Sequence, residues 1–125
     1  MSDKPLLTVS VDFDGTITKS PDPDSPDFNV LRPYCKELMT FLNAVGVKFY
    51  LLTGRKDEYT QEAIDLCKEW ELPIDFSNPH RKIVTDVYID DKNLECTEVN
   101  WWSICLILYS RVLYIKAKNT KESKK

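Results

Sequence analysis

The stretch that decides the fold is Thr8-Val9-Ser10-Val11-Asp12-Phe13-Asp14-Gly15-Thr16. Its first half, with Leu6 and Leu7 before it, is an apolar, β-branched run typical of a buried strand. The run ends in two carboxylates, Asp12 and Asp14, that are separated by one residue. Ligands of open α/β sheets bind at the carboxyl ends of the strands. Two neighbouring acids are costly there unless they meet a cation or do chemistry, so the spacing predicts an active site.

Length and composition are typical of one globular domain. The chain has 125 residues, of which 42% are hydrophobic and 30% charged, enough to bury a core. No signal peptide is recognisable at its start, and the apolar region 101–115 is interrupted and shorter than the ~20 residues of a membrane-spanning helix. The four cysteines show no paired spacing, which is typical of reduced thiols in a core. We therefore expect a cytoplasmic protein that does not enter a membrane.

The charges are unevenly distributed along the chain. Residues 116–125 carry five lysines and one glutamate, a charge of +4, so the overall charge of −3 leaves −7 on residues 1–115. We expect residues 1–115 to form a single catalytic domain and residues 116–125 to be a basic, disordered tail. An acidic body disfavours an anionic substrate unless metal ions reverse the local field.

Strand and helix patterns alternate along the chain. Further strands are predicted at 47–52, 74–76 and 87–89, and helices from 30–33 to about 45, from 57 to 72, and from 100 to about 109 or beyond. The alternation predicts an α/β fold with a doubly wound, mainly parallel, Rossmann-like sheet that is covered on both faces. Residues 17–30 are rich in proline and aspartate and are expected to form a loop, either a solvated connection or a flap beside the site.

Polar residues follow two further strands. Thr53-Gly54-Arg55 comes after the second strand, and Asp90-Asp91 after the last. In a parallel sheet these ends share one edge with Asp12 and Asp14. Carboxylates from two strands suit Mg²⁺, and a hydroxyl with a glycine N–H at a helix start suits phosphate.

Two basic residues complete the predicted site. Lys82 can neutralise charge that develops at such a centre. Arg55 can reach a substrate phosphate or pair with a surface acid, and the residues favour neither alternative. Singly, Thr53-Gly54 and Asp90-Asp91 are also ordinary turns, so the ordered set carries the prediction.

The same pieces in the same order resemble the haloacid dehalogenase (HAD) superfamily of phosphotransfer enzymes. The matching residues are Val11-Asp12-Phe13-Asp14-Gly15-Thr16, Leu51-Leu52-Thr53-Gly54-Arg55, Lys82 and Tyr88-Ile89-Asp90-Asp91. They bracket residues 6–93, and the last motif looks like that of small bacterial or phage members. Only 36 residues separate Thr16 from Thr53, and 26 separate Arg55 from Lys82, which leaves no room for a cap domain.

The resemblance implies a role for each matching residue. Asp12 would be the nucleophile that forms an aspartyl-phosphate, and Asp14 the general acid and then the base. Metal binding would fall to Asp12, the backbone carbonyl of Asp14, and Asp90, with Asp91 a ligand or a neighbour of one. Thr53, Gly54 and Lys82 would bind the phosphoryl group. The expected cofactor is Mg²⁺.

The resemblance predicts a capless, Mg²⁺-dependent phosphomonoester hydrolase acting on a small molecule, a nucleotide or a nucleic-acid end. A polynucleotide end phosphatase is one alternative, because an open site would admit a polymer. A non-catalytic phosphate-binding or regulatory domain is another. Finally, Trp101 and Trp102 lie in an apolar run that is first of all core, and we expect them at a contact between copies of the chain in a homo-oligomer.

Overall fold

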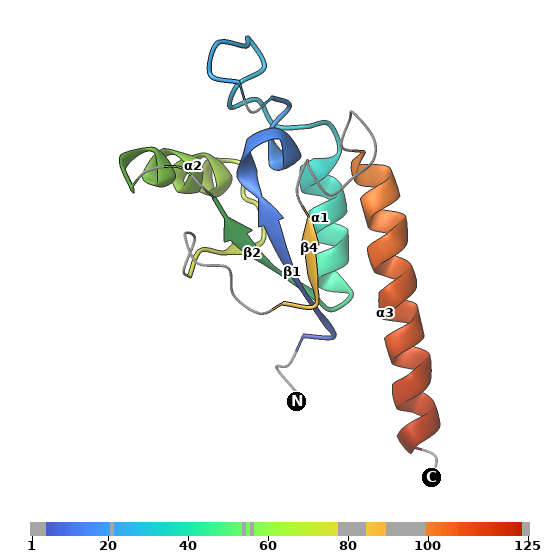
Figure 1. Cartoon of the computed structure of the whole chain (residues 1–125). Helices are drawn as coiled ribbons and strands as arrows, with labels where there is room; N and C mark the ends of the chain where they lie inside the picture. Colours follow the sequence, from blue (N-terminus) through green and yellow to red (C-terminus); the bar gives the residue numbers. More distant parts are fainter. Residues whose placement is uncertain are drawn as a thin grey trace.

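A four-stranded parallel sheet organises the molecule (Figure 1). The computed structural model describes residues 5–20, 22–53, 55, 57–77, 85–89 and 100–123. The elements are β1 (Leu7–Asp12), η1 (Phe13–Ile17), α1 (Cys35–Ala44), β2 (Val47–Leu52), α2 (Asp57–Glu69), β3 (Ile74–Asp75), β4 (Val87–Ile89) and α3 (Trp101–Ser123).

The strand order is β3-β2-β1-β4, and each pair is parallel. β1 is central: Val11 pairs with Leu51 of β2 on one side and with Ile89 of β4 on the other. The predicted α/β fold with a parallel, Rossmann-like sheet is therefore confirmed. The strands formed where apolar residues predominate, with β-branched or aromatic side chains among them, and the bounds of β2 and β4 are those predicted.

One face of the sheet is much more buried than the other. Along β2, Val47, Phe49 and Leu51 are buried, while the alternate residues 48, 50 and 52 are half-buried. Residues paired in register share a face, so Leu7 and Val9 of β1 belong to the buried side. The main hydrophobic core lies on this face.

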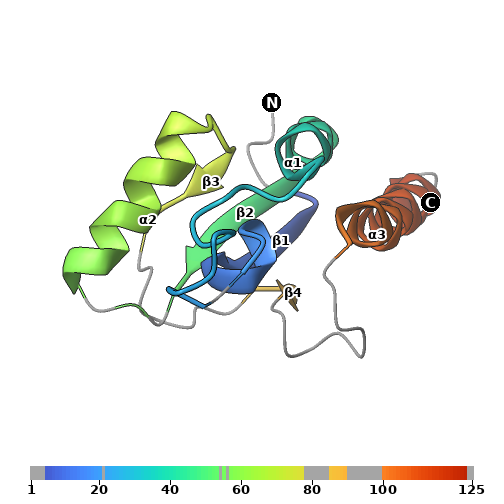
Figure 2. The same cartoon turned by 90° about the horizontal axis from the view of Figure 1, so that it is seen from above.

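Helices α1 and α2 both pack on the buried face. The crossovers from β1 to β2 and from β2 to β3 step in the same direction, and right-handed crossovers then place both helices on one side. Cys35 of α1 and Cys67 of α2 are accordingly close enough to influence each other electrostatically. Helix α3 lies beside α1, where Tyr109 meets Phe41 edge to face at 5.2 Å (Figures 1 and 2).

The doubly wound arrangement, with helices on both faces, is not confirmed for the part of the chain that the structure describes. Within that part the second face is closed partly by Thr85, whose hydroxyl donates to Ser10 Oγ at 3.0 Å. Asp86 also binds to β1: its carboxylate accepts hydrogen bonds from the N–H and the hydroxyl of Thr8.

Helix α3 corrects one expectation. It continues to Ser123, so residues 116–123 are helical and the prediction of a disordered tail from 116 onward is wrong for them. Helix propagation needs little more than the absence of Gly and Pro, and a lysine-rich segment meets that condition. Trp101 is 2% exposed and belongs to the core, as its apolar surroundings predict, whereas Trp102 is 53% exposed. The expected contact between copies of the chain stays a prediction. Among the described residues, no helix is long and apolar enough to cross a membrane.

Residues 18–31, which we call the flap loop, fold back on themselves. Thr18 bridges Leu31, Ser20 bridges Phe28, and the N–H of Lys19 donates to the carbonyl of Val30 at 2.8 Å. The expected loop is thus present as an ordered excursion between η1 and α1. Whether it closes over a ligand stays a prediction.

Candidate functional site

The turn after β1 positions the two predicted catalytic carboxylates, Asp12 and Asp14, at the carboxyl end of this strand. The N–H of Thr18 donates to the carbonyl of Phe13 at 3.1 Å, which closes a single wide turn of π type. Gly15 has φ +79, a conformation that favours glycine, and its N–H donates to Thr18 Oγ1 at 3.1 Å. Asp12 therefore ends the strand and Asp14 projects from the turn.

The backbone of this turn is fixed from the side of α1 and α3. The guanidinium of Arg32 donates to the carbonyl of Gly15 at 2.7 and 3.3 Å, and to that of Lys19 at 3.4 Å. The indole N–H of Trp101 donates to the carbonyl of Thr16 at 3.0 Å in a buried position. These bonds satisfy carbonyls that a buried turn would otherwise leave unpaired.

From the side of α2, Arg55 pairs with Asp14. Its Nε donates to Asp14 Oδ2 at 2.9 Å and its Nη2 to Oδ1 at 2.6 Å, a bidentate ion pair. Nη2 also donates to Asn29 Oδ1 at 2.6 Å, while Nη1 donates to Glu62 Oε1 at 3.3 Å and to the carbonyl of Tyr59 at 3.4 Å. Arg55 thus joins the turn, the flap loop and α2.

The surroundings of Arg55 leave it little freedom. Its guanidinium carbon lies 4.9 Å from the ring centroids of both Phe13 and Phe28, and its side chain is 8% exposed. Burial lowers the pKa of Arg55, but the hydrogen bonds and charges of Asp14 and Glu62 outweigh burial and raise it. The group is therefore a permanent cation with a complete set of partners.

In the structure Arg55 pairs with an acid, and whether it also reaches a substrate phosphate stays a prediction. The acid is Asp14, the expected general acid, so both carboxylate oxygens of Asp14 accept hydrogen bonds from Arg55. The pair therefore fixes the orientation of the Asp14 carboxylate.

Thr53 lies where the sequence predicts. It follows the last residue of β2, Leu52, which is in register with Asp12. Thr53 is buried, and its hydroxyl accepts a hydrogen bond from the N–H of Arg55 at 3.2 Å. The structure therefore brings Asp12, Asp14, Thr53 and Arg55 to one edge of the sheet.

The other predicted site residues lie outside the described residues. They are Gly54, Lys82, Asp90 and Asp91. Ile89, the described residue directly before Asp90, pairs with Val11, the residue before Asp12. Their predicted roles stay predictions.

The described residues supply part of a donor set for Mg²⁺. No group of three or more His, Cys, Asp or Glu that could hold a metal ion occurs among them. Asp12 nevertheless offers a hard carboxylate at the strand end, which fits Mg²⁺ chemistry. The ion pair with Arg55 involves the carboxylate of Asp14, whereas the resemblance assigns its backbone carbonyl to the metal, so the two are compatible.

One buried hydroxyl supports a polar ligand near the turn. Thr16 is fully buried, and its Oγ1 has no hydrogen-bond partner within the described structure. Such groups are rare in folded proteins and call for an explanation, of which a bound polar group is one.

Two cavities flank the turn. One, of about 470 Å³, is lined by Asp14, Pro23, Phe28, Arg55, Tyr59 and Glu62. The other, of about 520 Å³, lies at the start of α1 and α3 and is lined by Lys19, Asp27, Arg32, Pro33, Tyr34, Asn100, Trp101 and Trp102.

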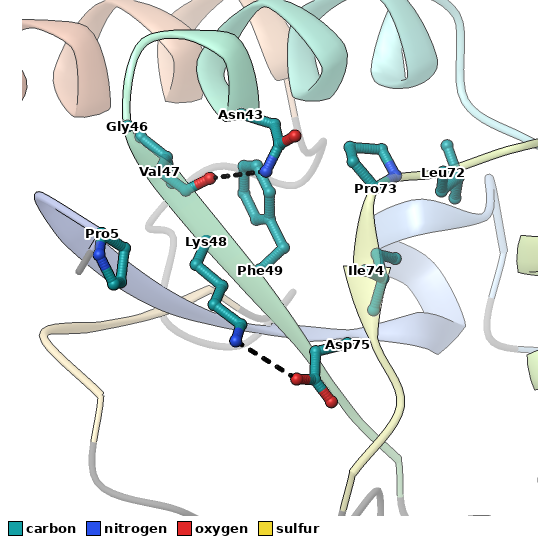
Figure 3. A pocket seen from close by; sticks show the side chains of 10 residues that line it. All are labelled: Pro5, Asn43, Gly46, Val47, Lys48, Phe49, Leu72, Pro73, Ile74 and Asp75. Carbon is teal, nitrogen blue, oxygen red and sulfur yellow. Dashed lines mark hydrogen bonds and ion pairs between the residues drawn. The ribbon is translucent and has the colours of Figure 1, made fainter. Parts of the chain in front are cut away.

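A third hollow lies at the opposite, amino-terminal end of the strands (Figure 3). It is about 490 Å³ and contains the start of β2 and all of β3. Lys48 pairs there with Asp75 at 3.4 Å, and Asn43 donates to the carbonyl of Val47 at 3.0 Å. A hydrogen bond from Ser77, and then the charge of Lys48, lower the pKa of Asp75. None of the predicted site residues lines it.

Sequence reasoning missed three residues of the site: Phe28, Asn29 and Glu62. They belong to the flap loop and α2, and they meet at Arg55 only after folding. Asn29 has φ +60, which asparagine tolerates, and its amide donates to Glu62 Oε1 at 2.7 Å. No motif marks them; the nearest signal was the length and proline content of the loop.

The chain matches no family model and no curated protein. It is similar to the solved structure of a conserved protein from Bacteroides thetaiotaomicron, with 26% identity and a TM-score of 0.68. The match covers 84% of this chain and 91% of that one. The description of that protein names no activity, so the likeness supports the α/β fold and leaves the chemistry to be argued from the site.

Proposed function

We propose that this chain is a phosphomonoester hydrolase of the capless haloacid dehalogenase type. The observation that carries the proposal is the position of Asp12. It ends the central strand of a parallel sheet, with Asp14 two residues later and Thr53 at the end of the neighbouring strand. Reactive groups of open α/β sheets belong at this edge.

In the proposed mechanism, the carboxylate of Asp12 attacks phosphorus. A bond forms between Asp12 and phosphorus while the bond to the leaving oxygen breaks, and Asp14 donates the proton that this oxygen needs. Asp14 then takes a proton from water, which attacks the aspartyl-phosphate and releases phosphate. Thr53 would hold a phosphoryl oxygen throughout, together with Gly54 and Lys82.

Mg²⁺, held by Asp12, the carbonyl of Asp14, and Asp90 with Asp91, would neutralise phosphate charge when bound. Asp14 must leave Arg55 before it can act. When Asp14 leaves, Glu62 and Asn29 remain as hydrogen-bond partners of Arg55, so the buried guanidinium is not left without an acceptor.

The same ion pair supports a second candidate, a non-catalytic phosphate-binding domain. If Asp14 never leaves Arg55, the chain can hold a phosphoryl group but cannot protonate a leaving group. The two candidates share the fold and differ in turnover.

The test is phosphate release from an aryl phosphate, with and without Mg²⁺, by wild type and Asp12→Asn. We expect metal-dependent turnover that falls by at least about 10³-fold in Asp12→Asn, because the variant lacks the nucleophile. Circular dichroism should show an unchanged fold. Equal turnover by both proteins contradicts the assignment of Asp12, and binding without turnover favours the non-catalytic domain.

A further inference from the structure

The cavity that Asp14 shares with Arg55 has walls suited to an aromatic group. Pro23 and Phe28 of the flap loop line it together with Tyr59 of α2. Tyr59 is 53% exposed, so its ring is available for contact. A volume of about 470 Å³ accommodates a ring system, because ligand pockets typically span about 300–1,000 Å³.

The charges of this cavity are unusual for a protein expected to bind phosphate esters. Asp14 and Glu62 supply two negative charges, and Arg55 supplies one positive charge. A guanidinium has five N–H donors, and Arg55 makes five hydrogen bonds, all to protein acceptors. Among the described residues that line the cavity, Arg55 is the one cation, and while it is paired with Asp14 it has no donor left for a ligand anion.

From these walls and charges we infer that the cavity binds the leaving group of the substrate, and that this group is uncharged and aromatic, as in an aryl or nucleoside monoester. The inference rests on the proposed function, since it is the role of Asp14 as proton donor that puts the leaving group here. For as long as Asp14 is paired with Arg55, an anionic leaving group meets the carboxylates of Asp14 and Glu62 and no free donor of Arg55. A polynucleotide end, with its phosphodiesters, is disfavoured for the same reason.

Ring stacking would make the cavity select aromatic leaving groups over aliphatic ones. Aromatic side chains stack on the flat faces of bases and phenyl rings, and one such contact changes affinity by roughly tenfold. Release of Asp14 toward the leaving oxygen would leave Arg55 with Glu62 and Asn29, so the cavity keeps its shape while the proton donor moves.

Binding of phosphonates tests this without requiring turnover. Calorimetry with Mg²⁺ present would compare phenylphosphonate, methylphosphonate and 4-carboxyphenylphosphonate, none of which can be hydrolysed. We expect phenylphosphonate to bind about tenfold more tightly than methylphosphonate. The added carboxylate should remove most of that advantage.

Two variants locate the effect. Tyr59→Ala should reduce the preference for phenylphosphonate to within about twofold, while binding of methylphosphonate stays unchanged. The matched control is Tyr114→Ala, because Tyr114 is also exposed on a helix but lies on α3 and does not line the cavity. It should retain the full preference.

The outcomes separate the inference from the proposed function. If both phosphonates bind equally to wild type, or if Tyr59→Ala keeps the preference, the inference is wrong and the phosphate site stands. If the carboxylated compound binds as well as phenylphosphonate, the charge argument is wrong. If neither simple phosphonate binds, the phosphate site itself fails, and the inference falls with it.

Discussion

Arg32 and Arg55 hold the same turn from two sides, but with different chemistry. Arg32, near the start of α1, donates to backbone carbonyls, chiefly that of Gly15. Arg55, before α2, donates mostly to side chains, chiefly the carboxylate of Asp14. A carbonyl of the turn cannot leave without unfolding it, whereas a carboxylate can rotate away. The contacts of Arg32 therefore hold the backbone of the turn in place, a scaffold role, whereas the contacts of Arg55 can be rearranged without unfolding the turn.

The largest effect should follow from removing the scaffold. Arg32→Met deletes two charge-assisted bonds to Gly15 and one to Lys19, and it leaves a partly buried carbonyl unpaired. We expect the free energy of unfolding to fall by about 3 kcal/mol, measured by urea denaturation. Lys36→Met is the control, because the Lys36–Glu71 pair is exposed and should contribute under about 0.5 kcal/mol. Equal losses in the two variants would remove the scaffold role.

Arg55→Met should cost less. Its partners Asp14 and Glu62 are partly exposed, at 23% and 49%, so water can replace the lost hydrogen bonds. We expect a loss of about 2 kcal/mol in urea denaturation, together with faster proteolysis within residues 22–31. A loss as large as that of Arg32→Met would break the distinction between the two sides.

Much of the fold could be predicted from the sequence, because its signals are local. The runs at Val47–Leu52 and Val87–Ile89 are apolar and β-branched, and both became strands at the predicted bounds. The lysines of residues 116–123 favour a solvated tail when only their charge is considered, but lysine is also a good helix former, and α3 extends through them. The predicted helices on both faces required knowledge of crossover direction, which no local pattern contains.

The site was predictable only in part. The positions of Asp12 and Thr53 are fixed by the ends of β1 and β2. The register pairs Asp12 with Leu52, the residue before Thr53, so the two strand ends lie side by side. The partner of Arg55 was not predictable, because Asp14 is 41 residues away in sequence and Asn29 is 26. Those contacts depend on the path of the flap loop.

The smallest predicted effect is a pH dependence of the free energy of unfolding that is caused by buried cysteine thiols. Burial raises the pKa of Cys67 to about 12, and burial also raises the pKa of Cys35. Cys35 belongs to α1 and Cys67 to α2, whereas Cys105 belongs to α3. An unfolded thiol ionises near about pH 8.5. Above that pH the unfolded state binds fewer protons than the folded state, so stability falls as the pH rises toward the folded pKa.

For Cys67 this window runs from about pH 9 to about pH 12. We expect the free energy of unfolding of wild type to fall by about 1 kcal/mol more than that of Cys67→Ala for one pH unit above pH 9. Urea denaturation at pH 9 and pH 10 measures the difference. Cys105→Ala should follow wild type more closely; the same slope in wild type and Cys67→Ala would contradict the role of burial.

The position of β1 has a consequence for how the molecule opens. Its backbone is hydrogen-bonded to β2 along six residues and to β4 along three, whereas β3 at the edge pairs through only two. Amide hydrogens of β1 that face β2 therefore exchange with solvent only when the two inner strands separate, while those of β3 exchange through local fraying. Asp12 is attached to the cooperative unit that opens last, so partial unfolding at the edge of the sheet leaves the proposed nucleophile in place.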